Sequence, residues 1–153
     1  MKEQGMSILV KRITRMTVSL ILLYGFYIAF HGHLSPGGGF AGGVIFALSM
    51  IHITLAFGRE GVKGILSKAH AALLESAGAL AFLLIGVAGI LTGTFFLNFL
   101  PAGYEFQLFS GGTMVFSNLA IFVKVGAGLF AVFAALAFLG PEGHAEEGDG
   151  GEQ

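Results

Sequence analysis

Leu34-Ser35-Pro36-Gly37-Gly38-Gly39-Phe40 separates two long runs of the chain that carry no Asp, Glu, Lys or Arg. One run lies between Arg15 and His31, and the other between Phe40 and Phe57. Each is close to the roughly 18 apolar residues expected of a helix that crosses a bilayer. Proline fixes one φ angle and glycine permits positive φ, so the stretch predicts a tight re-entry between two transmembrane helices.

Two further uncharged runs complete this pattern. The third lies between Glu75 and Glu105, and the fourth lies on both sides of Lys124. We therefore expect an all-α integral membrane fold, a bundle of about four transmembrane helices. The predicted spans are about 13–32, 40–57, 71–93 and 114–139. They form one domain over residues 1–140, and the acidic, glycine-rich segment 141–153 is predicted to be a disordered tail.

The composition favours lipid as the natural solvent of the chain. It is 55% hydrophobic and only 11% charged, whereas soluble domains are about a quarter charged. Cysteine is absent, so this chain alone carries no disulfide, thiolate zinc site or iron–sulfur cluster. There is also no Ser-His-Asp set, nucleotide motif or basic nucleic-acid face. We therefore expect neither an enzyme by itself nor a bound cofactor or metal.

The basic residues are distributed unevenly along the chain. Seven of the eight lie before the first span or between the second and third: Lys2, Lys11, Arg12, Arg15, Arg59, Lys63 and Lys68. The loops 33–39 and 94–113 contain neither lysine nor arginine. The positive-inside rule then places the N-terminus, the 58–70 loop and the C-terminus in the cytoplasm of a multi-pass plasma-membrane protein.

Lys124 is the sharpest candidate for chemistry because it lies near the middle of the fourth span. A central lysine costs roughly 2.5 to 3.5 kcal/mol on insertion scales, so it should face protein or water. Two interpretations are open: Lys124 handles protons or ions, or it forms a structural ion pair with a neighbouring helix.

Glu75 is the only carboxylate inside a predicted span. On the expected boundaries it lies about 11 residues, or about 16 Å, from the depth of Lys124, too far for direct contact. Pairing of the two would therefore need a water chain or a third helix that starts nearer Ile65. His52 in the second span matches the depth of Glu75 better. We therefore predict a Glu75–His52 pair as a proton relay, with a packing histidine as the alternative.

His31 and His33 bracket the external end of the first span. Residues two apart diverge on a helix, so a shared metal site is not expected. Either they cap the span at the interface or they belong to an ion path. Asn98 and Asn118 can bond neighbouring helices or line a wet path, and the sequence does not choose between these.

Glycines recur at helix-contact spacings in and beside the spans. Gly38 pairs with Gly42 and Gly39 with Gly43, and small residues let helices approach closely in lipid. We expect tight packing, rather than ligand binding, of the loop and the helix that follows it: Pro36, Gly37, Gly38, Gly39, Gly42 and Gly43. Gly78 does not extend such a series, because bulky Phe82 follows one turn later.

The string His31-Gly-His-Leu-Ser-Pro-Gly-Gly-Gly-Phe-Ala-Gly-Gly43 resembles the MnhB/MrpB family, small membrane subunits of Mrp-type Na⁺/H⁺ antiporter complexes. The stretch from Asn118 to Gly128 resembles the last helix of that family. The resemblance covers nearly the whole chain and implies a fold of about four spans. Related subunits occur in membrane-bound hydrogenases and similar complexes, in which an Mrp-like module couples electron transfer to ion translocation.

The resemblance implies a subunit of a multisubunit cation/proton antiporter module, with other membrane subunits and lipid as partners and Na⁺ and H⁺ as transported ions. The candidate path residues are Lys124, Glu75, His52, His31 and His33. The alternatives are a subunit of a redox-driven pump of the membrane-bound hydrogenase type, where it would be non-catalytic, and a purely structural scaffold subunit. A stand-alone cation exporter is disfavoured, because the first span has no carboxylate.

Overall fold

The computed structural model describes residues 6–58, 68–100 and 110–138. These residues form four helices and no strand: α1 (Ile8–Phe30), α2 (Gly38–Phe57), α4 (Lys68–Thr92) and α5 (Thr113–Phe138). All four are long and apolar enough to cross a membrane. At a rise of 1.5 Å per residue they span about 30 to 39 Å, against a hydrocarbon core of about 30 Å. The expected all-α membrane fold is confirmed.

The helix boundaries differ from the expected spans by a few residues. The largest difference is at α1, which begins at Ile8 instead of residue 13 because the Ser7 side chain accepts a hydrogen bond from the Val10 amide, 3.5 Å. Lys11, Arg12 and Arg15 therefore lie within the first turns of α1. The predicted tail 141–153, together with Arg59 and Lys63, lies outside the described residues.

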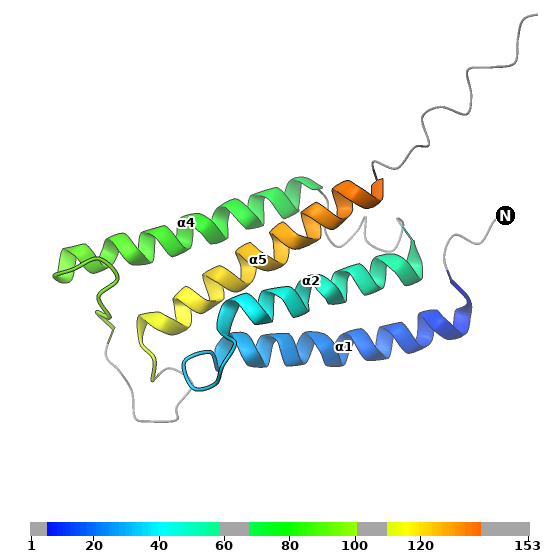
Figure 1. Ribbon diagram of the computed structural model, residues 1–153, viewed down its shortest axis with the longest axis horizontal. Helices are drawn as coiled ribbons and strands as arrows, with labels where there is room; N and C mark the ends of the chain where they lie inside the picture. Colours follow the sequence, from blue (N-terminus) through cyan, green and yellow to red (C-terminus); the bar gives the residue numbers. More distant parts are fainter. Residues whose placement is uncertain (1–5, 59–67, 101–109, 139–153) are drawn as a thin grey trace, which may run out of the picture.

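The four helices are arranged approximately in a row, in the order α1, α2, α5, α4 (Figure 1). α1 packs on α2, α2 packs on α5, and α5 packs on α4, with a smaller contact between α1 and α5. Among the described helices, α4 packs against α5 alone. Successive helices run in opposite directions, so the start of α1 and the end of α5 lie at the same end of the molecule.

Small residues set the distance between α2 and its neighbours. A Cβ atom placed on Gly43 would lie 2.8 Å from the Phe122 carbonyl oxygen of α5, and one on Gly42 would lie 2.8 Å from the Gly25 carbonyl oxygen of α1. Such approach strengthens dispersion between helices in lipid, where no hydrophobic drive acts between them. α4 packs on α5 equally closely at Gly78, where a Cβ atom would lie 2.8 Å from the Lys124 amide nitrogen, and it forms the end of the row.

Candidate functional site

Lys124 lies in the middle of α5, where it is the twelfth of 26 residues. Its side chain is exposed in the isolated chain. The backbone at this position packs against Gly78 of α4: a Cβ atom on Gly78 would lie 3.0 Å from the Lys124 Cβ and 2.8 Å from its amide nitrogen. The absence of a side chain at Gly78 therefore leaves the space in which the stem of Lys124 starts.

Glu75 packs on the same interface from the opposite helix. Its carboxyl carbon lies 3.3 Å from the position that a Cβ atom on Gly128 would occupy. Gly128 follows Lys124 by one helical turn, and Glu75 precedes Gly78 by about one turn. The two charged residues are thus about one turn apart across the α4–α5 interface.

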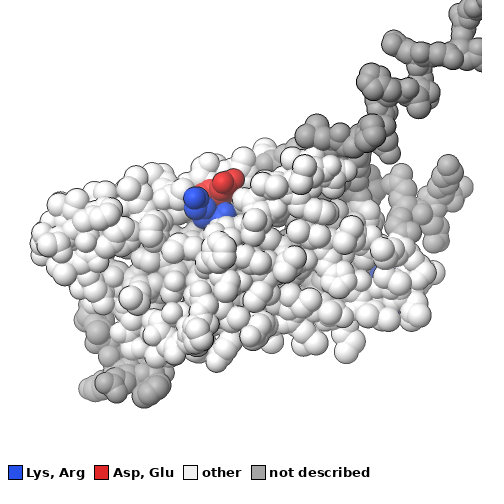
Figure 2. Space-filling model, in the orientation of Figure 1, with Lys and Arg blue, Asp and Glu red and all other residues white. Residues whose placement is uncertain are grey.

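Figure 2 shows this arrangement from outside, with an acidic and a basic group side by side near the middle of a face that carries little other charge. Glu75 is the only acidic residue among those the structure describes. Among the residues that the structure describes, the side chains of Lys124 and Glu75 form no hydrogen bond or ion pair. An apolar surface at mid-span therefore carries two opposite charges that lie near each other and are not joined directly.

The expected separation of about 16 Å between Lys124 and Glu75 is wrong. That value took the start of the third helix at residue 71 and set the ends of the third and fourth helices at one level. α4 begins at Lys68, in the direction of the earlier start that pairing was expected to require. The contacts of Gly78 with Lys124 and of Gly128 with Glu75 fix the actual register, in which α4 and α5 are offset along their axes. The offset reduces the separation in depth between the two charged residues to about one helical turn, or about 6 Å.

The proposed Glu75–His52 relay receives no support from the helix arrangement. His52 is half-buried on α2, and α5 lies between α2 and α4, which do not pack on each other among the described residues. Lys124, and not His52, is therefore the ionisable side chain that faces the same interface as Glu75.

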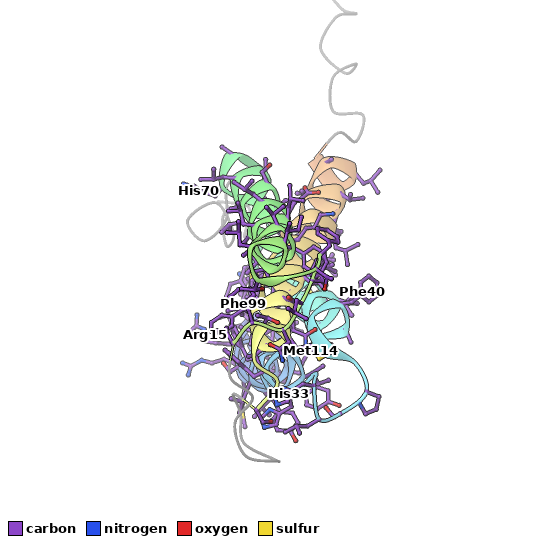
Figure 3. All side chains as sticks on the ribbon, turned by 90° about the vertical axis from the view of Figure 1, so that its left-hand side faces the viewer. Arg15, His33, Phe40, His70, Phe99 and Met114 are labelled. Atoms are coloured by element: carbon purple, nitrogen blue, oxygen red, sulfur yellow. The ribbon has the colours of Figure 1, made fainter. Side chains whose placement is uncertain are left out.

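His31 and His33 lie at the end of the molecule where α1 turns into α2. His31 follows the last residue of α1, donates from Nδ1 to the Tyr27 carbonyl oxygen at 3.0 Å, and stacks on the Tyr27 ring at 4.2 Å. His33 Nε2 is 3.1 Å from Ser110 Oγ, in a hydrogen bond that joins this turn to the start of α5. Figure 3 looks along the helices from this end and shows His33 on the side away from α4. The two rings thus have different partners, and the described residues contain no group of three potential metal ligands.

The glycine loop makes its closest contact with Asn118 of α5. Gly37 and Gly38 have φ angles of +133° and +66°, which only glycine adopts readily, and α2 begins at Gly38. The Gly39 amide donates to Asn118 Oδ1 at 3.3 Å. This supplies a hydrogen-bond partner for one of the otherwise unpaired amides at the start of α2. The sequence left two roles open for Asn118, a hydrogen bond to a neighbouring helix or the lining of a wet path, and the structure shows the hydrogen bond.

Two residues of this site were not identified from the sequence. The sequence pattern predicts no contact for Gly78, which is followed by bulky Phe82, and none for Gly128, yet these glycines provide the space for Lys124 and Glu75. A signal was present, since each charged residue has a glycine about one turn away on its own helix. Glycine at this spacing leaves room on the helix for a long side chain that arrives from a neighbour.

Comparison with known proteins gives a consistent set of matches. A family model, described as a domain related to the MnhB subunit of Na⁺/H⁺ antiporter, matches residues 9–131. An uncharacterized protein of Methanocaldococcus jannaschii is 37% identical over 119 residues, which cover 72% of this chain and 44% of that protein. A Staphylococcus aureus (strain Newman) protein assigned as antiporter subunit mnhB2 is 44% identical over 62 residues, 40% of this chain and 43% of that protein.

A similar fold is present in a solved respiratory complex. One chain of the membrane-bound sulfane sulfur reductase, an archaeal respiratory membrane complex, matches with a TM-score of 0.74 and 26% identity. The match covers 88% of this chain and 62% of that chain. The matched regions thus span less than half of the two curated relatives and less than two thirds of the solved chain.

Proposed function

Because the chain belongs to the family of domains related to the MnhB subunit of Na⁺/H⁺ antiporters, we propose that it is a membrane subunit of a multisubunit cation/proton antiporter module. In this role it packs against other membrane subunits and contributes Lys124 and Glu75 to the path of the ion or proton. The observation that carries the proposal is the placement of these two charges about one turn apart at mid-span.

The chemistry of the pair suits proton or cation transfer. An ammonium can release a proton and a carboxylate can accept one, and ionisable groups inside a membrane are kept mainly where they serve transport. The carboxylate of Glu75 also attracts a cation, and the nearby charge of Lys124 opposes its stable capture. A cation that enters this region is therefore held weakly enough to leave again, as transport requires.

The same subunit in a redox-driven complex is the second candidate function. Its specific support is the fold match to a chain of the sulfane sulfur reductase, a respiratory membrane complex. In such a complex we propose a non-catalytic role for this chain, with electron transfer carried out by other subunits. The residues assigned to the ion path stay the same in both assemblies.

Transport by the assembled complex tests the proposal. We expect Lys124→Ala to reduce Na⁺-dependent H⁺ movement at least tenfold in inverted membrane vesicles, read with a pH-sensitive dye, while the complex is recovered in normal amount. Lys11→Ala is the matched control, because Lys11 lies in the first turn of α1, far from the pair. Normal transport by Lys124→Ala would refute the path role, and loss of the complex would favour the scaffold role.

The complex to which this subunit belongs is identified by the proteins that co-purify with it. Affinity purification of the tagged full chain from native membranes, followed by mass spectrometry, distinguishes the two assemblies. Antiporter subunits alone support the first candidate function. Co-purified redox subunits, together with transport that requires an electron donor, support the second.

A further inference from the structure

The face formed by α4 and α5 is incompletely covered in the isolated chain. In the apolar windows of α4 and α1, the helices at the two ends of the row, only 17% and 22% of the residues are buried, against 39% in α2 and 33% in α5. Figure 3 shows α4 at the side of the molecule opposite to α1, and α5 is its only packing partner among the described helices. This face also carries Lys124, whose side chain is exposed at mid-span.

Lipid is a poor cover for this face. A charged side chain in contact with acyl chains is costly, and intramembrane charges therefore face protein or water and pair with each other. Glu75 is half-buried against Gly128, whereas Lys124 is exposed. Both charged groups reach the surface of this face (Figure 2), and Lys124 is the more exposed of the two, so the group that complements it on whatever covers the face is a second acid.

We propose that a transmembrane helix of a different subunit covers the α4–α5 face and places a carboxylate against Lys124. The inference rests on the proposed function, because it requires a multisubunit assembly. It goes further by assigning the contact face and the chemistry of the partner. Lys124 then lies between two carboxylates, its own Glu75 and one from the partner, in a site shared by two subunits.

A second copy of this chain does not provide this complement. Two copies that share an axis normal to the membrane carry equivalent residues at the same depth. In such a dimer Lys124 of one copy meets either Lys124 or Glu75 of the other, and the second contact requires Glu75 to leave its place on Gly128. Like charges repel in low dielectric, and a distinct helix that brings its own acid needs no such rearrangement, so it fits this face better.

Photo-crosslinking identifies the segment that covers the α4–α5 face. A benzoyl-phenylalanine placed at Leu74 lies on α4 next to Glu75 and one turn before Gly78, at a position that is 40% exposed. In the intact complex in native membranes, we expect this probe to capture a transmembrane segment that contains Asp or Glu. The same probe at Leu20, 62% exposed on α1, is the control and should capture a different segment or lipid. Capture at Leu74 of lipid alone, of a second copy, or of a segment without an acidic residue overturns the proposal.

Charge reversal tests the chemistry of the contact independently. We expect Lys124→Glu to lower the recovery of the captured subunit with the tagged chain at least tenfold, whereas Lys124→Gln retains it. Changing the partner's acidic residue to lysine should restore recovery with Lys124→Glu, which separates a lost contact from a misfolded chain. Unchanged recovery with Lys124→Glu, or failure of this rescue, overturns the proposal.

The outcomes also separate this inference from the proposed function. If Lys124→Gln assembles but does not transport, the path role stands whatever the crosslinks show. If Leu74 captures an acidic helix and Lys124→Gln transports normally, the contact face stands and the path role fails.

Discussion

Glycine residues determine where charge is placed in this molecule. Gly78 admits the stem of Lys124, and Gly128 admits the carboxyl group of Glu75. Each glycine lies on the helix opposite to the charged residue that it accommodates. A Cβ atom at Gly78 would meet the α5 backbone and push α4 away, whereas one at Gly128 would displace the flexible carboxyl end of Glu75 by a few tenths of an ångström. The geometry of the pair therefore depends most on the absence of a side chain at Gly78.

The backbones of α2 and α5 approach each other more closely at Gly39 than those of α4 and α5 do at Gly78. A Cβ atom there would overlap the carbonyl oxygen of Asn118, and that atom belongs to the backbone. We predict that Gly39→Ala destabilises the protein by about 1–3 kcal/mol, as overpacking of a close contact does. Thermal unfolding in detergent, followed by size-exclusion chromatography of a fluorescent fusion, measures this change. Phe40→Ala is the control, because Phe40 is 64% exposed, and equal midpoints for the two variants would show that the Gly39 contact can relax.

At the scale of single helices, the start of α5 depends on a residue that precedes it by 15 positions. Asn98 Oδ1 accepts hydrogen bonds from the amide and the hydroxyl of Thr113, both at 2.9 Å. The Asn98 side chain therefore acts as an N-terminal cap that the preceding segment supplies. Both of the asparagines singled out in the sequence thus bond to the start of a helix, Asn118 to α2 and Asn98 to α5.

We predict that Asn98→Ala frays the first turn of α5. Loss of a cap costs about 0.5–2 kcal/mol, and hydrogen exchange of the amides at residues 113–116 should speed up correspondingly, about fivefold for each 1 kcal/mol. Asn98→Asp keeps an oxygen acceptor in place and should leave exchange nearly unchanged. Equal rates in Asn98→Ala and the parent chain would show that other contacts fix this end.

The packing of α4 on α5 is testable because the chain has no cysteine of its own. A Cβ atom on Gly78 would lie 3.0 Å from the Lys124 Cβ, and disulfides join Cβ atoms about 3.8 Å apart, so a small shift suffices. We predict that the Gly78→Cys, Lys124→Cys variant forms a disulfide on mild oxidation. This disulfide should keep α4 and α5 linked after the chain is cut at a protease site inserted in segment 101–109.

The control for this experiment replaces Leu80 instead of Gly78. Leu80 is 56% exposed and lies about 200° around the helix from Gly78, since each residue advances 100°. The Leu80→Cys, Lys124→Cys pair should therefore stay reduced. Efficient bonding of both pairs would indicate that α4 rotates freely against α5, and bonding of neither would contradict the register.

At the scale of the whole molecule, the described helices place the start of α1, the end of α2, the start of α4 and the end of α5 at one end. Lys11, Arg12 and Arg15 lie in α1 toward that end. The orientation in the membrane follows from these charges through the positive-inside rule and stays a prediction.

Reporter fusions measure this orientation. We predict that green fluorescent protein fused after residue 153 is fluorescent, and that alkaline phosphatase fused after residue 35 is active, because one end faces the cytoplasm and the other faces out. Replacing Lys11, Arg12 and Arg15 with glutamine should weaken this preference. The opposite pattern of activities in the parent chain would invert the assignment of the ends.

The sequence by itself determined the class of fold and the family. Each helix requires only about 20 consecutive apolar residues, which is a local property of the chain. The motif around Pro36 is likewise contiguous, and the match to residues 9–131 agrees with the resemblance that it predicted. Local information was also sufficient to single out Lys124 and Glu75, because charge is rare in a span.

Only the tertiary structure decided which of these residues meet. The sequence predicted a Glu75–His52 pair and a Lys124 too deep to approach Glu75, whereas the structure puts α5 between His52 and Glu75 and aligns Lys124 with Gly78. The axial offset of two helices depends on how side chains on both surfaces interlock, and those side chains are far apart in sequence. For this reason the depth of a residue within its own helix did not predict its neighbour on the next one.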